Sequence, residues 1–399
     1  MGRQKITFAI LQWQSVTASV SRLIFFVLRK TPDKRFWIVG PDEIAGLTGE
    51  IGRYLQDSKI IILGRNNKFQ NEFSFVLLET KWRSLNHLLR LIVGPILFGW
   101  ILANAKGIIY VGDNGFLTTS FDNRAKEMEI AKDAGLIICC YLTGSDIRSI
   151  KLATLNEEKY GLELYPSYFR LVSNFFFTNN YELVKKSFAE AIDKHSDITF
   201  NAPFDQASYL VTKVYFFRYF IREARYSNLE DKFNSIDRIK ILHAPSNPLI
   251  KGTQIIRADV KRLQSEGYPV DYVELLGVSN EHVFQQLITS HIVINELYSM
   301  MPGVFAVEAM AAKCAVFTSA DQQFETLLPG ESNNAWVVVR PGNLYENLKY
   351  YLDNPAEIII KARLGYEWAS SYARATTNAA YLLNQLNEKY KDYKSRPTN

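Results

Sequence analysis

The chain of 399 residues is expected to fold as two doubly wound, Rossmann-like α/β domains that face each other across a cleft. Short runs of β-branched residues alternate with segments of helical periodicity along most of the chain, an order typical of parallel sheets covered by helices. A polar stretch interrupts this alternation a little past the middle. The apolar fraction of 47% is sufficient for the cores of two such domains.

These features divide the chain into a first domain at residues 1–225, a linker at 226–240 and a second domain at 241–375. The last residues, 376–399, are expected to form a terminal helix.

In the first domain, apolar residues at helical spacing predict a helix over residues 4–30. The apolar run 91–105 is expected to be a core or interfacial helix, because fifteen uncharged residues are fewer than the ~20 that span a membrane. Aromatic and basic residues interleave at 208–225, with the last arginines at helical spacing. The other expected strands are 35–40, 59–63, 106–112, 136–142, 171–178 and 198–201, and the other helices are 46–56, 127–134 and 181–191.

In the second domain, a β-branched strand at 291–295, an alanine-rich helix at 303–312 and a strand at 314–319 predict a βαβ unit with parallel strands. Its loop, 296–303, is then expected at the carboxyl ends of the strands. Open α/β sheets bind ligands there, because free N–H groups and the positive helix end favour an anion. The other expected strands are 238–243, 270–277 and 336–339, and the other helices are 252–266, 281–288, 344–353 and the tail from 358.

Glu308 is the one charged residue in the helix expected at 303–312. A buried carboxylate without donors is costly, so its side chain should face hydrogen-bond donors, and sugar hydroxyls would serve. The alternative is a partly solvated glutamate that the positive helix end favours.

The composition excludes several classes of protein. A net charge of +5 is modest for this length; it fits an anionic ligand or a membrane surface and does not indicate nucleic-acid binding. Cys139, Cys140 and Cys314 cannot form a disulfide framework, and no cysteine or histidine spacing indicates zinc. No signal peptide is predicted, and a reducing cytoplasm is the expected compartment.

Four motifs follow one another in the second domain, at 243–253, 273–278, 303–311 and 341–355. Together they closely resemble the donor half of family-4 glycosyltransferases of the GT-B fold. The first domain is similar in its order of elements, and its loop 144–148 resembles one found in polysaccharide-forming members. In this fold the terminal helix crosses back onto the first domain, so residues 376–399 are expected to do so.

The resemblance implies a nucleotide-sugar donor that is held mainly by the second domain. Lys251 matches the lysine that touches the diphosphate, and Glu308 matches the glutamate that binds the ribose hydroxyls. A lysine point charge offsets phosphate charge, and backbone N–H groups at 303–305 can approach closely. The implied donor-binding residues are Ser246, Lys251, Gly252, Gly277, Val278, Gly303, Val304, Phe305 and Glu308.

The implied reaction is a metal-independent, retaining transfer of a hexosyl group, in which Lys251 and the helix end stabilise the leaving group. No Asp-x-Asp triplet is present, so neither a metal site nor a cofactor is expected.

The candidate catalytic residues are Lys251 together with Asp113 and Asp146, which follow expected strands of the first domain. Either aspartate is a candidate for positioning the acceptor hydroxyl, and a turn-forming aspartate is the alternative for both. Gly46 and Gly49, after the first strand, are a candidate phosphate cradle, with an ordinary turn as the alternative. The candidates on the acceptor and phosphate side are Gly46, Gly49 and Arg148.

Three positions differ from the family pattern. Met300 replaces the first glutamate of Glu-x7-Glu, which normally contacts the sugar, and no arginine precedes Lys251. Thr143 takes the place of a histidine that often precedes the Gly-Ser-Asp loop. A subfamily variant with other sugar contacts and a catalytically silent partner subunit both fit these differences, and a nucleotide-sugar 2-epimerase of the same fold is a third interpretation.

Two segments predict peripheral contact with an anionic membrane. Residues 81–105, which include Trp82 and Trp100, and residues 207–225 combine apolar or aromatic side chains with basic ones. Aromatic side chains favour the headgroup boundary, and basic residues favour an anionic leaflet. The expected acceptor is therefore a saccharide, lipid-linked and used in surface-polysaccharide synthesis, and the expected location is the cytoplasmic face of the cell membrane. The alternative is that both segments pack on the first sheet.

Overall fold

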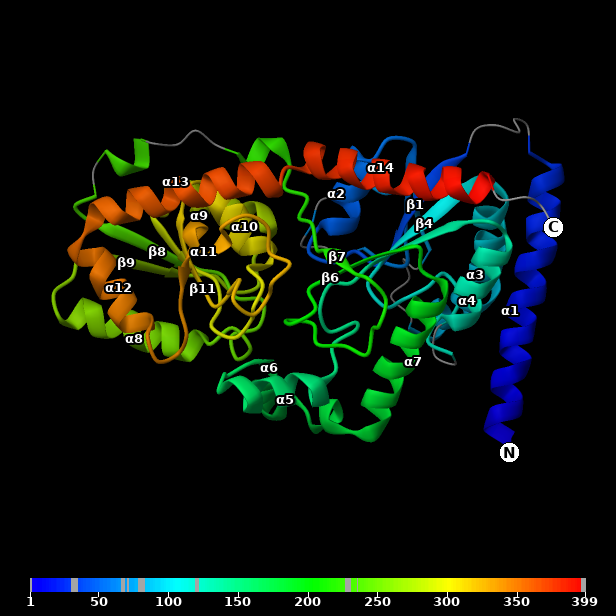
Figure 1. Cartoon of the computed structure of the whole chain (residues 1–399), viewed down its shortest axis with the longest axis horizontal. Coiled ribbons are helices and arrows are strands. Elements are labelled where there is room, and N and C mark those ends of the chain that lie inside the picture. Colours follow the sequence, from blue (N-terminus) through cyan, green and yellow to red (C-terminus); the bar gives the residue numbers. More distant parts are fainter. Residues whose placement is uncertain are drawn as a thin grey trace.

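The computed structural model describes residues 2–29, 35–65, 69, 72–77, 83–118, 122–226, 231–234 and 236–395. Two parallel sheets, each covered by helices, form two halves that lie one after the other along the long axis of the molecule (Figure 1). This arrangement confirms the predicted α/β class with two doubly wound halves. Trp82 and most of the polar stretch at 227–235 lie outside the described residues.

Among the described residues, the first sheet has seven parallel strands in the order β3-β2-β1-β4-β5-β6-β7. Strands β5 and β6 are buried along their whole length, as expected where helices cover both faces of a parallel sheet. The strands are β1 (Phe36–Pro41), β2 (Ser58–Ile62), β3 (Phe75–Val76), β4 (Ala105–Val111), β5 (Ile137–Tyr141), β6 (Ile198–Asn201) and β7 (Tyr215–Phe216).

The helices of the first half connect these strands and cover them. The long helix α3 runs into β4 without a loop, and the first helix of the chain, α1, packs along α3 at the outer edge of the molecule (Figure 1). The helices are α1 (Gly2–Val27), α2 (Leu47–Tyr54), α3 (Arg83–Asn104), α4 (Ala125–Asp133), α5 (Ile150–Tyr160), α6 (Tyr165–Val172) and α7 (Asn179–His195).

The strand predicted at 171–178 is wrong. This segment is the end of α6 followed by a short 3₁₀ helix, Asn174–Phe177. Its aromatic rings stack on helices, with the ring centroids of Phe169 and Phe176 4.9 Å apart, and Thr178 caps α7 by accepting a hydrogen bond from the Tyr181 N–H. Aromatic residues favour strands only where a sheet neighbour is present, and here none is.

In the described residues, the second sheet has five parallel strands in the order β12-β11-β10-β8-β9. The predicted βαβ unit is present, with Ile292 of β10 opposite Ala315 of β11 in parallel register. The strands are β8 (Ile239–His243), β9 (Val270–Glu274), β10 (Ile292–Ile294), β11 (Ala315–Thr318) and β12 (Val337–Val338). The helices are α8 (Thr253–Ser265), α9 (Asn280–Thr289), α10 (Gly303–Ala311), α11 (Ser332–Ala335), α12 (Leu344–Asp353), α13 (Pro355–Tyr372) and α14 (Ala375–Lys394).

Two segments of chain cross side by side from one half to the other. Ile221 pairs with Arg374 in an isolated parallel bridge, and the N–H of Ala375 donates to the Ile221 carbonyl. Helix α14 then lies along the first half (Figure 1), where Tyr390 packs against Trp37 at 6.2 Å between ring centroids. The end of the chain is therefore part of the first half rather than of the second.

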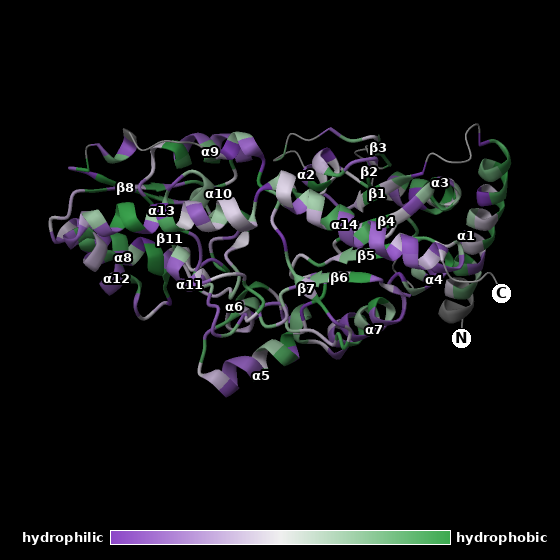
Figure 2. Cartoon of the chain, turned by 45° about the horizontal axis from the view of Figure 1, so that its top comes forward, coloured by the Kyte–Doolittle hydropathy of each residue, from purple (hydrophilic) through white to green (hydrophobic). Residues whose placement is uncertain are grey.

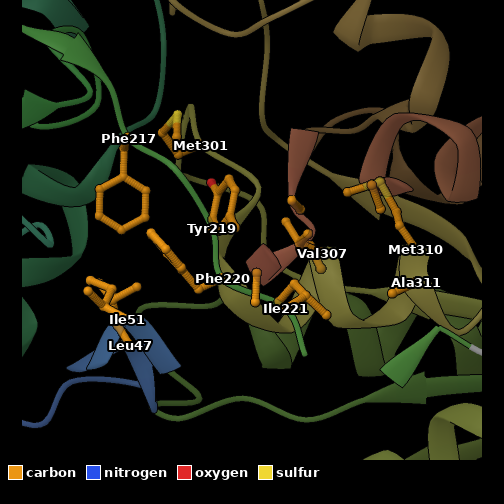
Figure 3. Close-up of a cluster of buried hydrophobic side chains, with 14 of the residues drawn as sticks. Leu47, Ile51, Phe217, Tyr219, Phe220, Ile221, Met301, Val307, Met310 and Ala311 are labelled. Atoms are coloured by element: carbon orange, nitrogen blue, oxygen red, sulfur yellow. The ribbon is translucent and has the colours of Figure 1, made fainter. Parts of the chain in front are cut away.

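The segment 208–225 is not the helix that its spacing suggested. It consists of β7, an extended stretch and a 3₁₀ turn, Glu223–Arg225. Phe217, Tyr219 and Phe220 are buried between α2 and α10, as Figure 3 shows. Because this core joins the two halves, Phe217, Tyr219 and Phe220 are not available to a membrane.

Candidate functional site

A cavity of about 430 Å³ lies between the two halves, at the carboxyl ends of both sheets. Thr143 after β5 and Asp205 after β6 line one side, and Ser246 after β8 and Asn295 after β10 line the other. Cavities of this size accept small molecules, and this edge of a parallel sheet is where such folds bind them. The cavity is therefore the candidate functional site.

Most of the predicted donor-binding residues line this cavity. They are Ser246, Lys251, Gly277, Val278, Gly303, Val304, Phe305 and Glu308, and Arg148 of the first half lines it as well. The predicted residues Gly252, Gly46, Gly49, Asp113 and Asp146 do not line it.

Gly252 shapes the cavity without lining it. Its φ of 75° lies in the left-handed region, which glycine adopts without strain, and α8 begins directly after it. A β-carbon at this position would lie 2.9 Å from the side chain of Leu297. The glycine thus lets the chain turn sharply from Lys251, which faces the cavity, into α8.

Lys251 pairs with a carboxylate that the sequence did not single out. Its Nζ lies 2.6 Å from Oε2 of Glu296, a residue that is only 1% exposed. The same oxygen accepts a hydrogen bond from the Tyr165 hydroxyl of the first half at 2.7 Å, and Oε1 accepts one from the Asn295 amide at 3.0 Å. Glu296 is therefore held by three donors from two halves of the molecule.

The carboxylate of Glu296 also lies at the start of α10. Gly303, the first residue of that helix, has a φ of 62°, and a β-carbon there would lie 3.5 Å from Oε1 of Glu296. Free N–H groups at a helix start attract anions. A positive side chain and a positive helix end thus converge on one point of the cavity, and in this structure a carboxylate of the chain occupies it.

Glu308 is buried at 9% exposure on the cavity side of α10. The Asn280 amide donates to both of its oxygens, at 3.1 and 3.3 Å. Burial raises the pKa of this carboxyl, and the positive charges of Arg225 and Arg222 and the Asn280 hydrogen bond oppose that shift. The partly solvated alternative is therefore wrong, and the side chain faces the cavity with acceptor capacity to spare.

Asp146 forms a turn, as the alternative for it proposed. Its oxygens accept hydrogen bonds from the N–H groups of Thr143, Gly144 and Ile147, at 2.8 to 3.0 Å. Both oxygens are thus directed into its own loop and away from an acceptor. Asp113 is half exposed outside the cavity and lies 3.8 Å from Lys185.

Gly46 and Gly49 form an ordinary helix start. Gly46, with a φ of 79°, precedes α2, and the Gly49 N–H donates to the carboxylate of Glu43 at 3.0 Å. The chain's own glutamate therefore takes the position that a phosphate would need in a cradle. Their neighbours Ala45 and Leu47 line the cavity instead.

Arg148 and Asp205 form a buried ion pair that the sequence did not predict. Arg148 Nη2 lies 2.7 Å from Asp205 Oδ2, and the guanidinium stacks on Tyr165. The other oxygen of Asp205 accepts hydrogen bonds from the Ser299 hydroxyl and the Met300 N–H of the second half, both at 2.7 Å. Asp205 thus ties the wall of the cavity to the opposite half.

Glu325 also forms hydrogen bonds that join the two halves. Its carboxylate, which belongs to the second half, accepts hydrogen bonds from the N–H groups of Phe204 and Asp205 at 2.9 and 3.1 Å. Burial raises the pKa of Glu325 to about 7, and the nearby charge of Asp205 adds to the shift.

The sequence analysis missed Glu296 and Asp205, and the only signal for them was that each lies shortly after a strand. Glu296 follows β10 by two residues, and Asp205 follows β6 by four. Polar residues at these points gather at one edge of a parallel sheet. Which of them face the opposite half depends on how the two halves meet, and no local pattern encodes that.

Among the described residues, no group of three or more histidine, cysteine or acidic side chains is placed to hold a metal ion. His243 has a structural role: its ring nitrogens lie 2.8 Å from the Ile294 carbonyl and 2.9 Å from the Thr253 hydroxyl. Burial lowers the pKa of this histidine to about 4.

No protein-family model matches the chain, and no curated protein matches its sequence. Solved structures do match it along most of its length. Sucrose-phosphate synthase from Thermosynechococcus elongatus has a TM-score of 0.57 and 13% identity, over 90% of this chain and 100% of that one. Anabaena HepE in complex with UDP and glucose has a TM-score of 0.52 and 12% identity, over 89% and 99%. A Listeria monocytogenes protein assigned as a UDP-N-acetylglucosamine 2-epimerase has a TM-score of 0.50 and 13% identity, over 90% and 96%.

The fold is GT-B. The prediction of a GT-B fold from the motifs in the second half is thus confirmed. Identities of 12–13% show the fold alone, so family 4 is not distinguished from other GT-B families. The GT-B cavity between the halves holds Lys251, the start of α10 and Glu308.

Proposed function

We propose that the chain transfers a hexosyl group from a nucleotide-sugar donor to a saccharide acceptor. The observation that supports this most is the convergence of Lys251, the start of α10 and Glu308 on one cavity between GT-B halves. A positive side chain and free helix N–H groups suit a diphosphate, and a buried carboxylate suits sugar hydroxyls. HepE, which shares the fold, is solved with UDP and glucose in its structure.

In the proposed mechanism the diphosphate binds between Lys251 and the N–H groups of Gly303 and Val304. Glu308, which Asn280 orients, accepts hydrogen bonds from the ribose hydroxyls. As the bond between sugar and diphosphate breaks, negative charge grows on the leaving group, and the fixed positive charges stabilise it without a metal. Retention of configuration and the absence of a metal and of a cofactor remain part of the proposal.

Glu296 must release Lys251 when the diphosphate binds, because the carboxylate and the phosphate favour the same positive charges. On the opposite wall, Thr143 and Arg148 border the space proposed for the acceptor. The acceptor is proposed to be lipid-linked, in surface-polysaccharide synthesis at the cytoplasmic face of a membrane.

A 2-epimerase is the second candidate, because a protein assigned to that activity shares the fold over 90% of this chain. It would use the same donor site but need no acceptor. A silent partner subunit is the third, and the pairing of Lys251 with Glu296 favours it, since a cation that stays neutralised binds no donor.

Isothermal titration calorimetry against UDP-, GDP- and ADP-sugars tests the proposal and separates these candidates. A transferase should bind at least one donor and release its nucleoside diphosphate only when a lipid extract or saccharide acceptor is added. Conversion of the free nucleotide sugar to its 2-epimer would identify the epimerase. No binding to any donor would overturn both enzyme functions.

A further inference from the structure

The outer edge of the first half has an apolar face that no part of the described chain covers. Helices α1 and α3 lie along each other there, and Figure 2 shows α1 at the edge of the half, with hydrophobic residues along part of its length. Large apolar side chains recur on each helix at spacings of three and four, which places them on one face. They are Val16, Val20, Leu23 and Val27 of α1 and Leu85, Leu88, Ile92 and Ile96 of α3, and all are between 40% and 80% exposed.

The inner face of α1 accounts for its packing without this outer face. Gln14, Ala18 and Ser21 are buried, and Ala18 and Ser21 lie beside Gly99 of α3. The two backbones approach closely at Gly99, where a β-carbon would lie 2.4 Å from Cβ of Ser21. The outward residues are therefore not needed to hold α1 in place.

The charges of these helices indicate what the face contacts. The sequences of α1 and α3 contain the basic residues Arg3, Lys5, Arg22, Arg83 and Arg90 and no aspartate or glutamate. Of these, Arg90 is directed into the first half, where its guanidinium donates to the carbonyls of Gly115 and Leu117. Helices that carry an apolar stripe, contain basic residues and lack acidic ones are typical of the headgroup region of anionic bilayers. A second copy of the chain docked on the same face would bring the positive charges of the two copies together.

We propose that the face formed by α1 and α3 binds the surface of an anionic lipid bilayer. This surface differs from the one expected from the sequence, because Phe217, Tyr219 and Phe220 of the segment 207–225 are buried and α1 takes the place of that segment. The inference extends the proposed function by saying where the molecule attaches, and its test does not depend on sugar transfer.

The helices lie on the bilayer and do not cross it. One helix of the described chain, Leu85–Asn104, is long and apolar enough to span a membrane. However, its second half contributes Phe98, Ile101 and Leu102 to the core, each at most 1% exposed, and it continues directly into β4. Only its outward stripe is free to enter the headgroup region.

The test is sedimentation of the whole protein with vesicles of phosphatidylcholine and with vesicles of equimolar phosphatidylcholine and phosphatidylglycerol. The variant combines Val20→Gln, Leu23→Gln, Leu88→Gln and Ile92→Gln. A matched control combines Leu155→Gln, Leu183→Gln, Ile360→Gln and Leu364→Gln, which are exposed apolar positions elsewhere.

The native protein and the control should sediment with the anionic vesicles, less so at high salt, and the variant should lose at least nine-tenths of this binding. All three should keep their thermal midpoints and their nucleotide binding, so a failure of the proposed sugar transfer would not change the result. Equal binding by native protein and variant would overturn the inference. So would the absence of vesicle binding by the native protein, and a dimer that the variant dissociates would then assign the face to a second copy.

Discussion

At the scale of single residues, Lys251 and Glu308 should be required for activity and not for folding. Alanine at either position removes a charge-assisted contact to the donor, worth about 1.5–3 kcal/mol, so donor affinity or kcat/KM should fall roughly tenfold to hundredfold. Steady-state kinetics with the identified donor measures this change. Lys261→Ala and Glu190→Ala, at exposed positions, are the matched controls and should behave like the native protein. Variants that unfold instead would assign Glu308 to the core alone.

Glu296 leads to a prediction of the opposite sign. Glu296→Gln removes the negative charge that pairs with Lys251 at 2.6 Å, so the lysine no longer has to leave an ion pair when a diphosphate binds. Affinity for UDP alone should rise about fivefold, the equivalent of ~1 kcal/mol. Calorimetric titration with UDP tests it. A weaker affinity would show that Glu296 supports the ligand rather than competing with it.

The sequence predicted a residue of the site only where a single motif contains both that residue and the neighbours that position it. Gly303 and Glu308 were singled out because a strand, a turn and a helix start follow one another within a few residues, and Lys251 because its motif resembles that of glycosyltransferase donor halves. Asp146 does not line the cavity, and its position after a strand does not reveal that three N–H groups of its own loop hold the carboxylate. Asp205 and Glu325 were missed because their partners come from the other half.

At the scale of elements, the attachment of α1 should depend on Gly99. A β-carbon there would lie 2.6 Å from the Ala18 carbonyl and 2.9 Å from the Arg22 N–H, so two backbones must separate. In Gly99→Ala, this separation should lower the free energy of unfolding by about 1–3 kcal/mol. The better helix propensity of alanine should restore about 1 kcal/mol of that loss. The substitution should also speed proteolysis within α1.

Gly342→Ala is the control for this prediction, because no atom lies within 4 Å of the β-carbon it would add. Thermal unfolding and limited proteolysis of the two variants measure the difference. Equal behaviour of both variants would show that α1 is not fixed through this contact.

Helices and strands were predictable where the residues within the segment itself determine its conformation. Strand β10, the turn at Gly303 and helix α10 combine a β-branched run, a glycine and good helix formers, and each local preference agrees with the fold. The segments 171–178 and 208–225 have many aromatic residues, whose conformation is set by the surfaces they pack on. Those surfaces are helices in the first case and the junction of the two halves in the second.

At the scale of the whole molecule, the two halves meet through polar contacts that surround the cavity. Tyr165 bonds to Glu296, Asp205 to Ser299 and Met300, and Glu325 to the backbone beside Asp205. The sequence predicted two domains and a cleft, because the alternation of strands and helices and the polar stretch between the domains can be read from it directly. It did not predict how the cleft closes, because each of these contacts joins residues about 100 or more positions apart in the chain.

Glu325 should make the contact between the halves sensitive to pH. Burial raises its pKa to about 7 in the folded protein, whereas the ordinary value is 4.5. The folded protein therefore binds this proton more tightly than the unfolded chain, and stability from this group is complete below pH 4.5 and is lost as the pH rises to about 7.

Glutamine at position 325 keeps an acceptor for the N–H groups of Phe204 and Asp205 but does not ionise. Relative to Glu325→Gln, the native protein should thus become less stable between pH 5 and 8, by up to about 3 kcal/mol. Chemical unfolding at several pH values measures this difference, with Glu331→Gln, at an exposed position, as the control. Parallel stability curves for the native protein and Glu325→Gln would show that the carboxyl titrates normally, and the contact between the halves would then not respond to pH.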